Sequence, residues 1–317
     1  MSHERDSEGR LVPDPQKFPN GLKALGDYLH GLGLKFGIYS DAGTHTCAGY
    51  PASYGYERID ARSFAEWGVD LLKYDYCYSP AGAHDVTLYR RMGQALRETG
   101  RPIIYSVCWG DGKTWNWGRS VGAHMWRITG DIIDKWESVE RVGYCSVGLE
   151  SYAGPNAWND PDMMVIGLNG SGYIGALGGG CTLDEYRTHF TLWCILCAPL
   201  LMGHDVRNTP PEIKEILLNK EAIAVNQDPA GIQAFRIPGW VEALAKPLED
   251  GSVAVAVLNR ESYRYMLPVP WEALGWEVSD HVKVRDLWKH EDLGIFKGAV
   301  TAALEPHSCA FYRLQRV

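Results

Sequence analysis

The chain has 317 residues, 45% hydrophobic and 22% charged, a composition that is ordinary for a globular protein with a large core and allows two domains. The formal net charge of −8 argues against a nucleic-acid partner, because binding to phosphates needs a basic face. No apolar run approaches the roughly 18–20 residues of a membrane helix. The polar start MSHERDSEGR lacks the apolar centre of a signal peptide.

Short apolar segments alternate with helical patterns through the first two-thirds of the chain. We expect strands at 34–40, 69–77, 103–108, 125–130 and 163–167, and a sixth within 197–205. Residues 20–33 predict a helix with one apolar face formed by Leu22, Leu25, Leu29 and Leu32, and residues 85–100 predict another with Leu88, Met92 and Leu96. This alternation implies an α/β fold with a parallel sheet and right-handed crossovers.

The pattern changes after about Gln233. Residues 239–260 read as a β-hairpin with its turn at 249–251, and residues 282–288 and 309–317 continue the alternation of apolar and polar side chains. We therefore expect a barrel-type catalytic domain over residues 1–232 and an antiparallel β domain over residues 233–317.

Paired carboxylates are the first candidate for chemistry, because glycoside hydrolysis needs one on each side of the scissile bond. Asp75 ends a largely apolar strand, and Lys73 lies two residues earlier, on the same side of that strand. A lysine in that position would keep Asp75 ionised, as a nucleophile requires. The alternative is a structural ion pair at the end of a strand.

Asp131 ends a later strand, and Arg127 precedes it by an even step, so both should face the same way. Arg127 could bind substrate hydroxyls or adjust the proton affinity of Asp131. The alternative is that Asp131 caps a helix over 132–142. Asp160 and Asp162 flank a proline in a further segment, where turn formation and sugar binding are both compatible with the sequence.

Two other motifs are weaker. Residues 170–175, GSGYIG, match a dinucleotide-binding pattern, but neither the helix nor the later acidic residue of that motif follows. Cys194 and Cys197 have the C-x-x-C spacing inside an apolar run without a second ligand pair, which favours a buried helix face over metal or redox chemistry.

Taken together, these segments resemble glycoside hydrolase family 27, the family of α-galactosidases and α-N-acetylgalactosaminidases. The matching stretches are residues 33–77, 126–132, 158–167, 196–208 and 223–231. They run in the order of the family and cover nearly the whole chain. The resemblance implies a (β/α)8 TIM barrel followed by an antiparallel β-sandwich. It also implies a galactose-containing oligosaccharide or glycoside as substrate, with no metal or organic cofactor.

The resemblance further assigns roles to individual residues. Asp75 matches the nucleophile and Asp131 the acid/base of a retaining α-galactosidase, whose carboxyl groups should lie roughly 5–6 Å apart. The sugar-contacting positions are Tyr39, Lys73, Arg127 and Asp162. Cys47 and Cys77 match a pair that is disulfide-bonded near the site, and the other six cysteines are expected to be unpaired.

One departure concerns selectivity. Trp109 stands where the α-galactosidases usually carry a glutamate that recognises the sugar 2-hydroxyl. An α-N-acetylgalactosaminidase or a β-L-arabinopyranosidase of the same family therefore remains an alternative.

A second departure concerns length. We count about six barrel strands, whereas the family begins with two further βα units that carry sugar-binding residues. We therefore expect the chain to start inside the barrel, as a fragment with an open sheet edge. Completion by a second chain in a homo-oligomer and a catalytically impaired sugar-binding protein are the alternatives. The compartment would be cytoplasmic for a complete chain and could be extracellular if a segment precedes it.

Overall fold

The computed structural model describes residues 1–108, 113–171, 179–240 and 242–317. Contacts divide the chain into two compact units, Met1–Ile128 and Thr129–Val317. The domain boundary expected at residue 232 stays a prediction. In the described ranges, no helix is long and apolar enough to cross a membrane.

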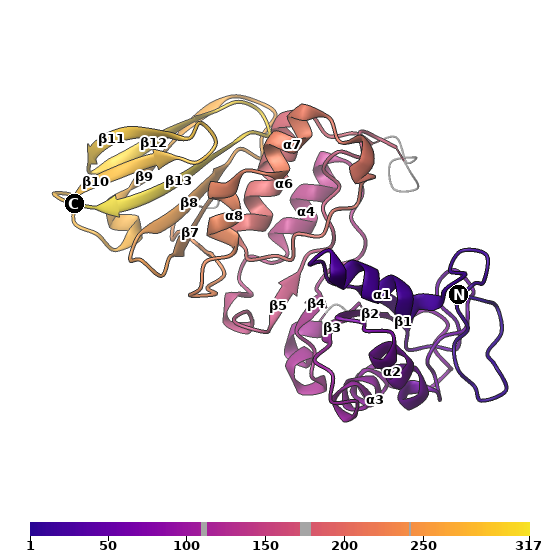
Figure 1. The fold of residues 1–317 in the computed structure, drawn as a ribbon. Helices are drawn as coiled ribbons and strands as arrows, with labels where there is room; N and C mark the ends of the chain where they lie inside the picture. The colour runs from indigo at the N-terminus through magenta and orange to yellow at the C-terminus, as the bar shows by residue number, and fades with distance from the viewer. Residues whose placement is uncertain (109–112, 172–178, 241) are drawn as a thin grey trace. The chain divides into compact units, whose positions relative to one another are not determined.

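The first unit contains a parallel sheet in which four strands pair in chain order (Figure 1). The strands are β1 (Gly37–Asp41), β2 (Leu71–Asp75), β3 (Ile104–Val107) and β4 (Met125–Arg127). The helices are α1 (Gly21–Gly31), α2 (Glu57–Glu66) and α3 (Asp85–Glu98), followed by 3₁₀ turns η1 (Thr114–Asn116) and η2 (Gly118–Val121). The first four predicted strands and both predicted helices are thus confirmed.

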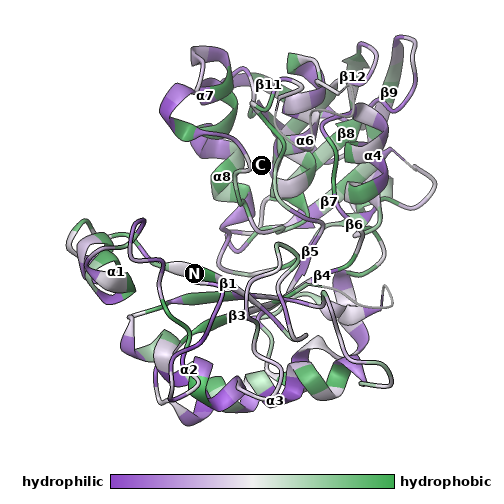
Figure 2. Cartoon of the chain, turned by 90° about the vertical axis from the view of Figure 1, so that its right-hand side faces the viewer, coloured by the Kyte–Doolittle hydropathy of each residue, from purple (hydrophilic) through white to green (hydrophobic). Residues whose placement is uncertain are grey.

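Buried and partly exposed side chains alternate strictly along β2, and this alternation determines which residues pack against α3. Leu72 and Tyr74 are fully buried, whereas the residues on either side of them are partly exposed. Tyr74 meets Tyr89 of α3, with ring centroids 5.9 Å apart. Figure 2 shows hydrophobic and hydrophilic residues side by side on α2 and α3, as amphipathic helices on one face of a sheet require. The predicted apolar face of α1 was wrong at Leu32, which is exposed because the helix ends at Gly31.

The second unit begins with a mainly helical part. Its helices are α4 (Trp136–Tyr144), α6 (Leu183–Ile195), α7 (Pro211–Leu217) and α8 (Lys220–Asn226), with 3₁₀ turns η3 (Glu150–Tyr152) and η4 (Val206–Asn208). Helix α4 starts at Trp136 with Lys135 at its N-cap, so the alternative reading of Asp131 as a helix cap was wrong.

The strand predicted at 163–167 was also misplaced. Strand β5 is Trp158–Asp160, and Pro161 follows it directly. Proline cannot donate a hydrogen bond to a strand ladder, and Asp162 adopts a φ of 88°, which interrupts an extended chain. Beyond this turn, Met164 forms only an isolated parallel bridge with Met202, from the segment expected to hold the sixth strand.

The rest of the second unit is an antiparallel β-sandwich. One sheet has the order β11-β10-β13-β8-β7-β6, and the other pairs β12 with β9. The bounds are β6 (Phe235–Arg236), β7 (Ala243–Pro247), β8 (Val253–Leu258), β9 (Tyr265–Pro270), η5 (Trp271–Leu274), β10 (His281–Asp286), β11 (Glu291–Lys297), β12 (Ala299–Leu304) and β13 (Cys309–Arg316). The predicted hairpin is β7–β8, with Gly251 at φ 82° in its turn.

Strand β8 is buried on both faces, because the larger sheet has a layer on each side. Ala254, Ala256 and Leu258 belong to the apolar cluster around α6, whereas Val255 and Val257 belong to the cluster between the two sheets. This explains why the strand is a continuous apolar run and shows no alternation of polar residues.

A histidine is enclosed in the cluster around α6. His189 is fully buried against Trp193, with ring centroids 4.1 Å apart, and neither of its ring nitrogens has a hydrogen-bond partner among the described residues. Burial lowers the pKa of His189 from 6.5 to about 3, because the apolar surroundings disfavour the charged imidazolium.

We predict that the free energy of unfolding decreases as the pH falls from about 6.5 toward 3. In that range the unfolded chain takes up a proton that the folded His189 does not, so stability is lost at up to about 1.4 kcal/mol per pH unit. Urea unfolding followed by tryptophan fluorescence over this pH range measures the slope. A His189→Leu variant should lose this contribution, and His84→Leu, at an exposed position, should keep it. Equal slopes in all three proteins would contradict the assignment.

Candidate active site

The candidate site of the first unit forms where β1 and β2 end. The two strands pair in parallel register, with Tyr39 beside Lys73 and Asp41 beside Asp75. The carboxyl ends of parallel strands lie at the same edge of a sheet, so polar side chains at these positions gather together. Lys73 and Asp75 are both on the partly exposed side of β2, as the even spacing predicts.

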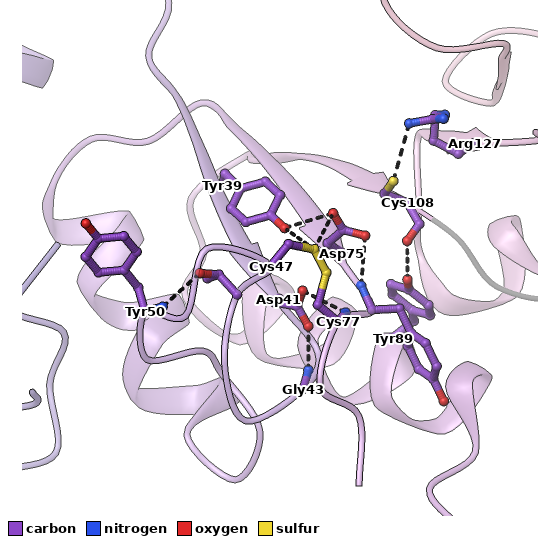
Figure 3. The surroundings of a disulfide bond; sticks show 12 residues. Tyr39, Asp41, Gly43, Cys47, Tyr50, Asp75, Cys77, Tyr89, Cys108 and Arg127 are labelled. Carbon is purple, nitrogen blue, oxygen red and sulfur yellow. Dashed lines mark hydrogen bonds between the residues drawn. A yellow bond between two sulfur atoms is a disulfide. The ribbon is translucent and has the colours of Figure 1, made fainter. Parts of the chain in front are cut away.

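Both carboxylate oxygens of Asp75 accept a hydrogen bond. The Tyr39 hydroxyl donates to Oδ2 at 2.8 Å (Figure 3). The backbone N–H of Tyr76 donates to Oδ1 at 2.9 Å. Although Tyr39 is 40% exposed, partial burial and the charge of Asp75 raise the pKa of Tyr39 far above its usual value. Tyr39 therefore stays a donor to Asp75. Among the described residues Lys73 makes no ion pair with Asp75, so Tyr39 holds the contact that the sequence suggested for Lys73.

A disulfide lies next to this carboxylate. Cys47 and Cys77 are bonded, with Cα atoms 5.3 Å apart, as the family resemblance implied. The Cys47 sulfur is 3.8 Å from Asp75 Oδ2 and 3.5 Å from the Tyr39 hydroxyl oxygen (Figure 3). The described residues form no second disulfide, also as expected. The bond joins the loop after β1 to the loop after β2, so it restricts the backbone next to Asp75.

Asp41 is a functional candidate to which sequence reasoning gave no role. Its carboxylate is fully buried and accepts the backbone N–H of Gly43 at 2.7 Å and of Cys77 at 2.9 Å. Burial raises the pKa of Asp41 to about 7, and the nearby charge of Asp75 adds to the rise, against the two hydrogen bonds. Its position at the end of β1 was the available signal, but the two N–H partners lie in loops that only the fold brings together.

The same cluster is the one group among the described residues whose atoms could surround a metal ion. Ligand atoms of Asp41, Cys47, Asp75 and Cys77 lie within 4.8 Å of one another. The disulfide removes both thiolates, which are the strong ligands of such a set, and leaves two carboxylates. The arrangement present therefore fits a nucleophile with a positioning carboxylate better than a metal centre.

Arg127 completes the candidates of the first unit. It ends β4 and is 4% exposed, with its Nη1 atom 3.5 Å from the sulfur of Cys108. Trp109, the residue in question for selectivity at the sugar 2-position, falls outside the described residues.

The second unit carries Asp131 and Asp162. Asp131 is exposed in the segment before α4. Asp162 is 5% exposed, and its Oδ2 accepts the backbone N–H of Ile132 at 2.9 Å while its Oδ1 accepts that of Met163 at 2.7 Å. Asp162 thus holds the backbone directly after Asp131. The predicted separation of the Asp75 and Asp131 carboxyl groups, which belong to different units, stays a prediction.

Asp162 is itself held in an unusual conformation. Its φ of 88° is rare for a residue with a side chain and is costly without support. The support comes from Asp160, whose Oδ1 accepts the N–H of Asp162 at 2.9 Å, and from the indole of Trp193, which donates to the Asp162 carbonyl oxygen at 2.8 Å. The turn-forming reading of Asp160 is therefore confirmed.

The structure adds no support for the dinucleotide-binding motif or the C-x-x-C motif. Residues 172–175 of the GSGYIG motif lie outside the described ranges. Cys194 is a buried residue of α6, and Cys197 is buried just after that helix. Neither belongs to a possible metal-binding group among the described residues.

Two family models match the chain. The model described as α-galactosidase A matches residues 1–228, and the model of the α-galactosidase C-terminal β-sandwich domain matches residues 238–314. Among relatives, the α-galactosidase of Cyamopsis tetragonoloba is 43% identical over 314 residues, which cover 98% of this chain and 74% of that protein.

Solved structures of proteins from the same family also match the chain. The α-galactosidase I of Mortierella vinacea matches with a TM-score of 0.91 and 36% identity over 99% of this chain and 85% of that one. The α-galactosidase of Saccharomyces cerevisiae with raffinose matches at 0.86 and 28% over 99% and 87%. The family 27 β-L-arabinopyranosidase of Geobacillus stearothermophilus matches at 0.85 and 26% over 98% and 82%.

We predict that Gly43→Ala destabilises the first unit. A Cβ at Gly43 would lie 1.9 Å from the Cys77 carbonyl oxygen, a backbone atom that Asp41 and the disulfide hold in place. Forced repacking of this kind costs about 1–3 kcal/mol. Thermal unfolding of the oxidised protein measures the effect. Gly31→Ala is the matched control, since a Cβ there meets nothing within 4 Å, and an equal Tm for both variants would refute the prediction.

Proposed function

This chain belongs to the α-galactosidase family, glycoside hydrolase family 27, and on that premise we propose that Asp75 and Asp131 are the nucleophile and the acid/base of a retaining reaction. The chain is an α-galactosidase, a glycoside hydrolase whose homologues act on galactosides. The observation that carries the assignment of the nucleophile is the cluster of Tyr39, Asp75 and the Cys47–Cys77 disulfide at the ends of β1 and β2.

In the first step, Asp75 attacks the anomeric carbon of a terminal α-D-galactosyl residue and forms a covalent glycosyl-enzyme. The hydrogen bonds from Tyr39 and from the N–H of Tyr76 fix the plane of the carboxylate. A nucleophile fixed in this way loses little conformational entropy when the substrate arrives. The disulfide and Asp41 also stabilise this geometry, because both are bonded to Cys77 in the loop that begins after Asp75.

Asp131 protonates the departing glycosidic oxygen and, in the second step, deprotonates the water that releases the sugar. An exposed carboxyl suits this role, because it must meet both the leaving group and water. The hydrogen bond from Ile132 to Asp162 limits the motion of the backbone that carries Asp131.

The remaining candidates would recognise the sugar. Lys73 and Tyr39 lie on the same side of the sheet as Asp75. Lys73 forms no ion pair with a carboxylate in the described part of the chain, and its ammonium group can donate to substrate hydroxyls. Arg127 and Asp162 are assigned sugar contacts by the resemblance, and Trp109 would determine tolerance at the 2-position. Oligosaccharides such as raffinose, present in the yeast structure, are the proposed substrate class.

We predict that Asp75→Asn and Asp131→Asn each lower the turnover of an aryl α-galactoside, for Asp75 by roughly three orders of magnitude or more. The reason is that an amide can neither form the glycosyl-enzyme nor exchange the proton. Asp27→Asn, an exposed residue of α1 paired with Lys23, is the control and should keep full activity. Circular dichroism and thermal unfolding establish that the variants fold.

Azide separates the two roles. With an Asp75→Gly variant, azide enters from the face that the nucleophile occupied and should yield the β-galactosyl azide. With an Asp131→Gly variant, azide captures the glycosyl-enzyme and should yield the α-galactosyl azide. Normal turnover in either Asn variant, or exchanged azide products, would defeat the assignment.

A second prediction concerns the sugar. The aryl α-D-galactoside should show a higher kcat/KM than the aryl α-N-acetylgalactosaminide and the aryl β-L-arabinopyranoside, since homologues at over 40% identity are named α-galactosidases. The arabinopyranosidase is the alternative that the structural likeness to the Geobacillus protein favours. Kinetics on the three glycosides decide between them. Binding of galactose in calorimetry with no hydrolysis of any would indicate a sugar-binding protein instead.

A further inference from the structure

A lysine is fully buried in the second unit, far along the chain from the candidate catalytic residues. Lys246 is on β7, where Ala243 and Ala245 face the other sheet and Leu244 joins the apolar cluster around α6. By the alternation of a strand, Lys246 faces the helices together with Leu244. Removing an ammonium group from water is expensive unless it gains close partners.

The partners of Lys246 are unusual for a buried cation. Its Nζ donates to the carbonyl oxygen of Val225 in α8 and to the sulfur of Cys197 at 2.9 Å. In the described parts of the chain, no carboxylate forms an ion pair with Lys246. Among the described residues, the close partners of the nitrogen are therefore a carbonyl oxygen and a sulfur atom.

Cys197 is held against this nitrogen from the other side. It lies two residues after the end of α6 and has a φ of 54°, a conformation that residues with side chains seldom adopt. Its thiol donates to the carbonyl oxygen of Ile232 at 3.1 Å. Burial raises the pKa of Cys197, and the neighbouring Lys246 offsets part of that rise. The sulfur is thus fixed between Ile232 and the lysine nitrogen and cannot easily turn away.

A cavity lies next to the residue whose carbonyl oxygen accepts this thiol. Ile232, whose carbonyl oxygen accepts the hydrogen bond from the Cys197 thiol, also lines a cavity of about 330 Å³ together with Gly231 and Gln233. Dioxygen is small and apolar and can enter a cavity of this size.

We propose that Cys197 and Lys246 form a reversible covalent cross-link in which one oxygen atom joins the sulfur to the nitrogen. The oxidant is dioxygen. Starting from the thiol and the neutral amine, the S–H bond and one N–H bond break, and an S–O and an O–N bond form. The two hydrogens and the second oxygen atom leave as water. Sulfur and nitrogen each lose two electrons, and the four electrons reduce one dioxygen molecule.

The cross-link would join strand β7 of the sandwich to the segment after α6, positions separated by 49 residues. A covalent bond between distant positions restricts the unfolded chain and stabilises the fold in the way that a disulfide does. We therefore expect the Tm of the second unit to rise by several degrees on oxidation and to fall again on reduction. This inference does not depend on the proposed catalytic roles.

The experiment compares the full chain kept under reductant with the same chain exposed to air-saturated buffer. Peptide mapping by mass spectrometry should find Cys197 and Lys246 in one cross-linked species that has gained one oxygen and lost two hydrogens, and dithiothreitol should release it. Peptide mapping is needed because formation of the Cys47–Cys77 disulfide also changes the mass of the whole chain, independently of the proposed cross-link.

Three variants provide the controls. Cys197→Ser and Lys246→Met should abolish the species, whereas Cys194→Ser should retain it, since Cys194 is a buried free cysteine three residues away. The unsubstituted chain and Cys194→Ser decide the question even if a variant at the buried lysine does not fold. A disulfide between Cys194 and Cys197, an oxidised Cys197 beside an unmodified Lys246, or an unchanged map after exposure would each overturn the proposal.

Discussion

The in-register parallel pairing of β1 with β2 is the constraint on which the candidate nucleophile depends. It places Tyr39 beside Lys73 and Asp41 beside Asp75. Side chains alternate along a strand, so a shift of one residue would turn Asp75 into the buried layer occupied by Tyr74 and remove the Tyr39 contact. Burial of Leu72 and Tyr74, with Tyr74 against Tyr89 of α3, stabilises the sheet and also determines which side of β2 carries the chemistry.

Both units use a buried carboxylate as a clamp on the backbone next to a proposed catalytic residue. Asp41 accepts two backbone N–H groups, one of them two residues after Asp75. Asp162 likewise accepts two, one of them directly after Asp131. A carboxylate buried for this purpose is costly to ionise, and the raised pKa of Asp41 reflects that cost.

Much of the first unit could be predicted, because apolar runs and helical spacing report directly on burial. The position of Asp75 at the C-terminal end of a strand followed from the apolar pattern. The disulfide followed only from the family resemblance. The contact between Tyr39 and Asp75 could not be derived from spacing, since it joins two strands 36 residues apart. The strand expected at 163–167 was misplaced because its apolar residues fit a core segment equally well, while the turn at Pro161 and Asp162 ended the strand earlier.

The core of the second unit shows two ways of keeping a basic side chain out of water. His189 stays neutral, and the whole cost of burial appears in its lowered pKa. Lys246 instead points its nitrogen at a carbonyl oxygen and a sulfur, so its burial depends on partners from α8 and from the segment after α6. A group that needs partners from separate elements ties those elements together. Replacing such a lysine by an apolar residue would remove both hydrogen bonds, one from β7 to α8 and one from β7 to the segment after α6.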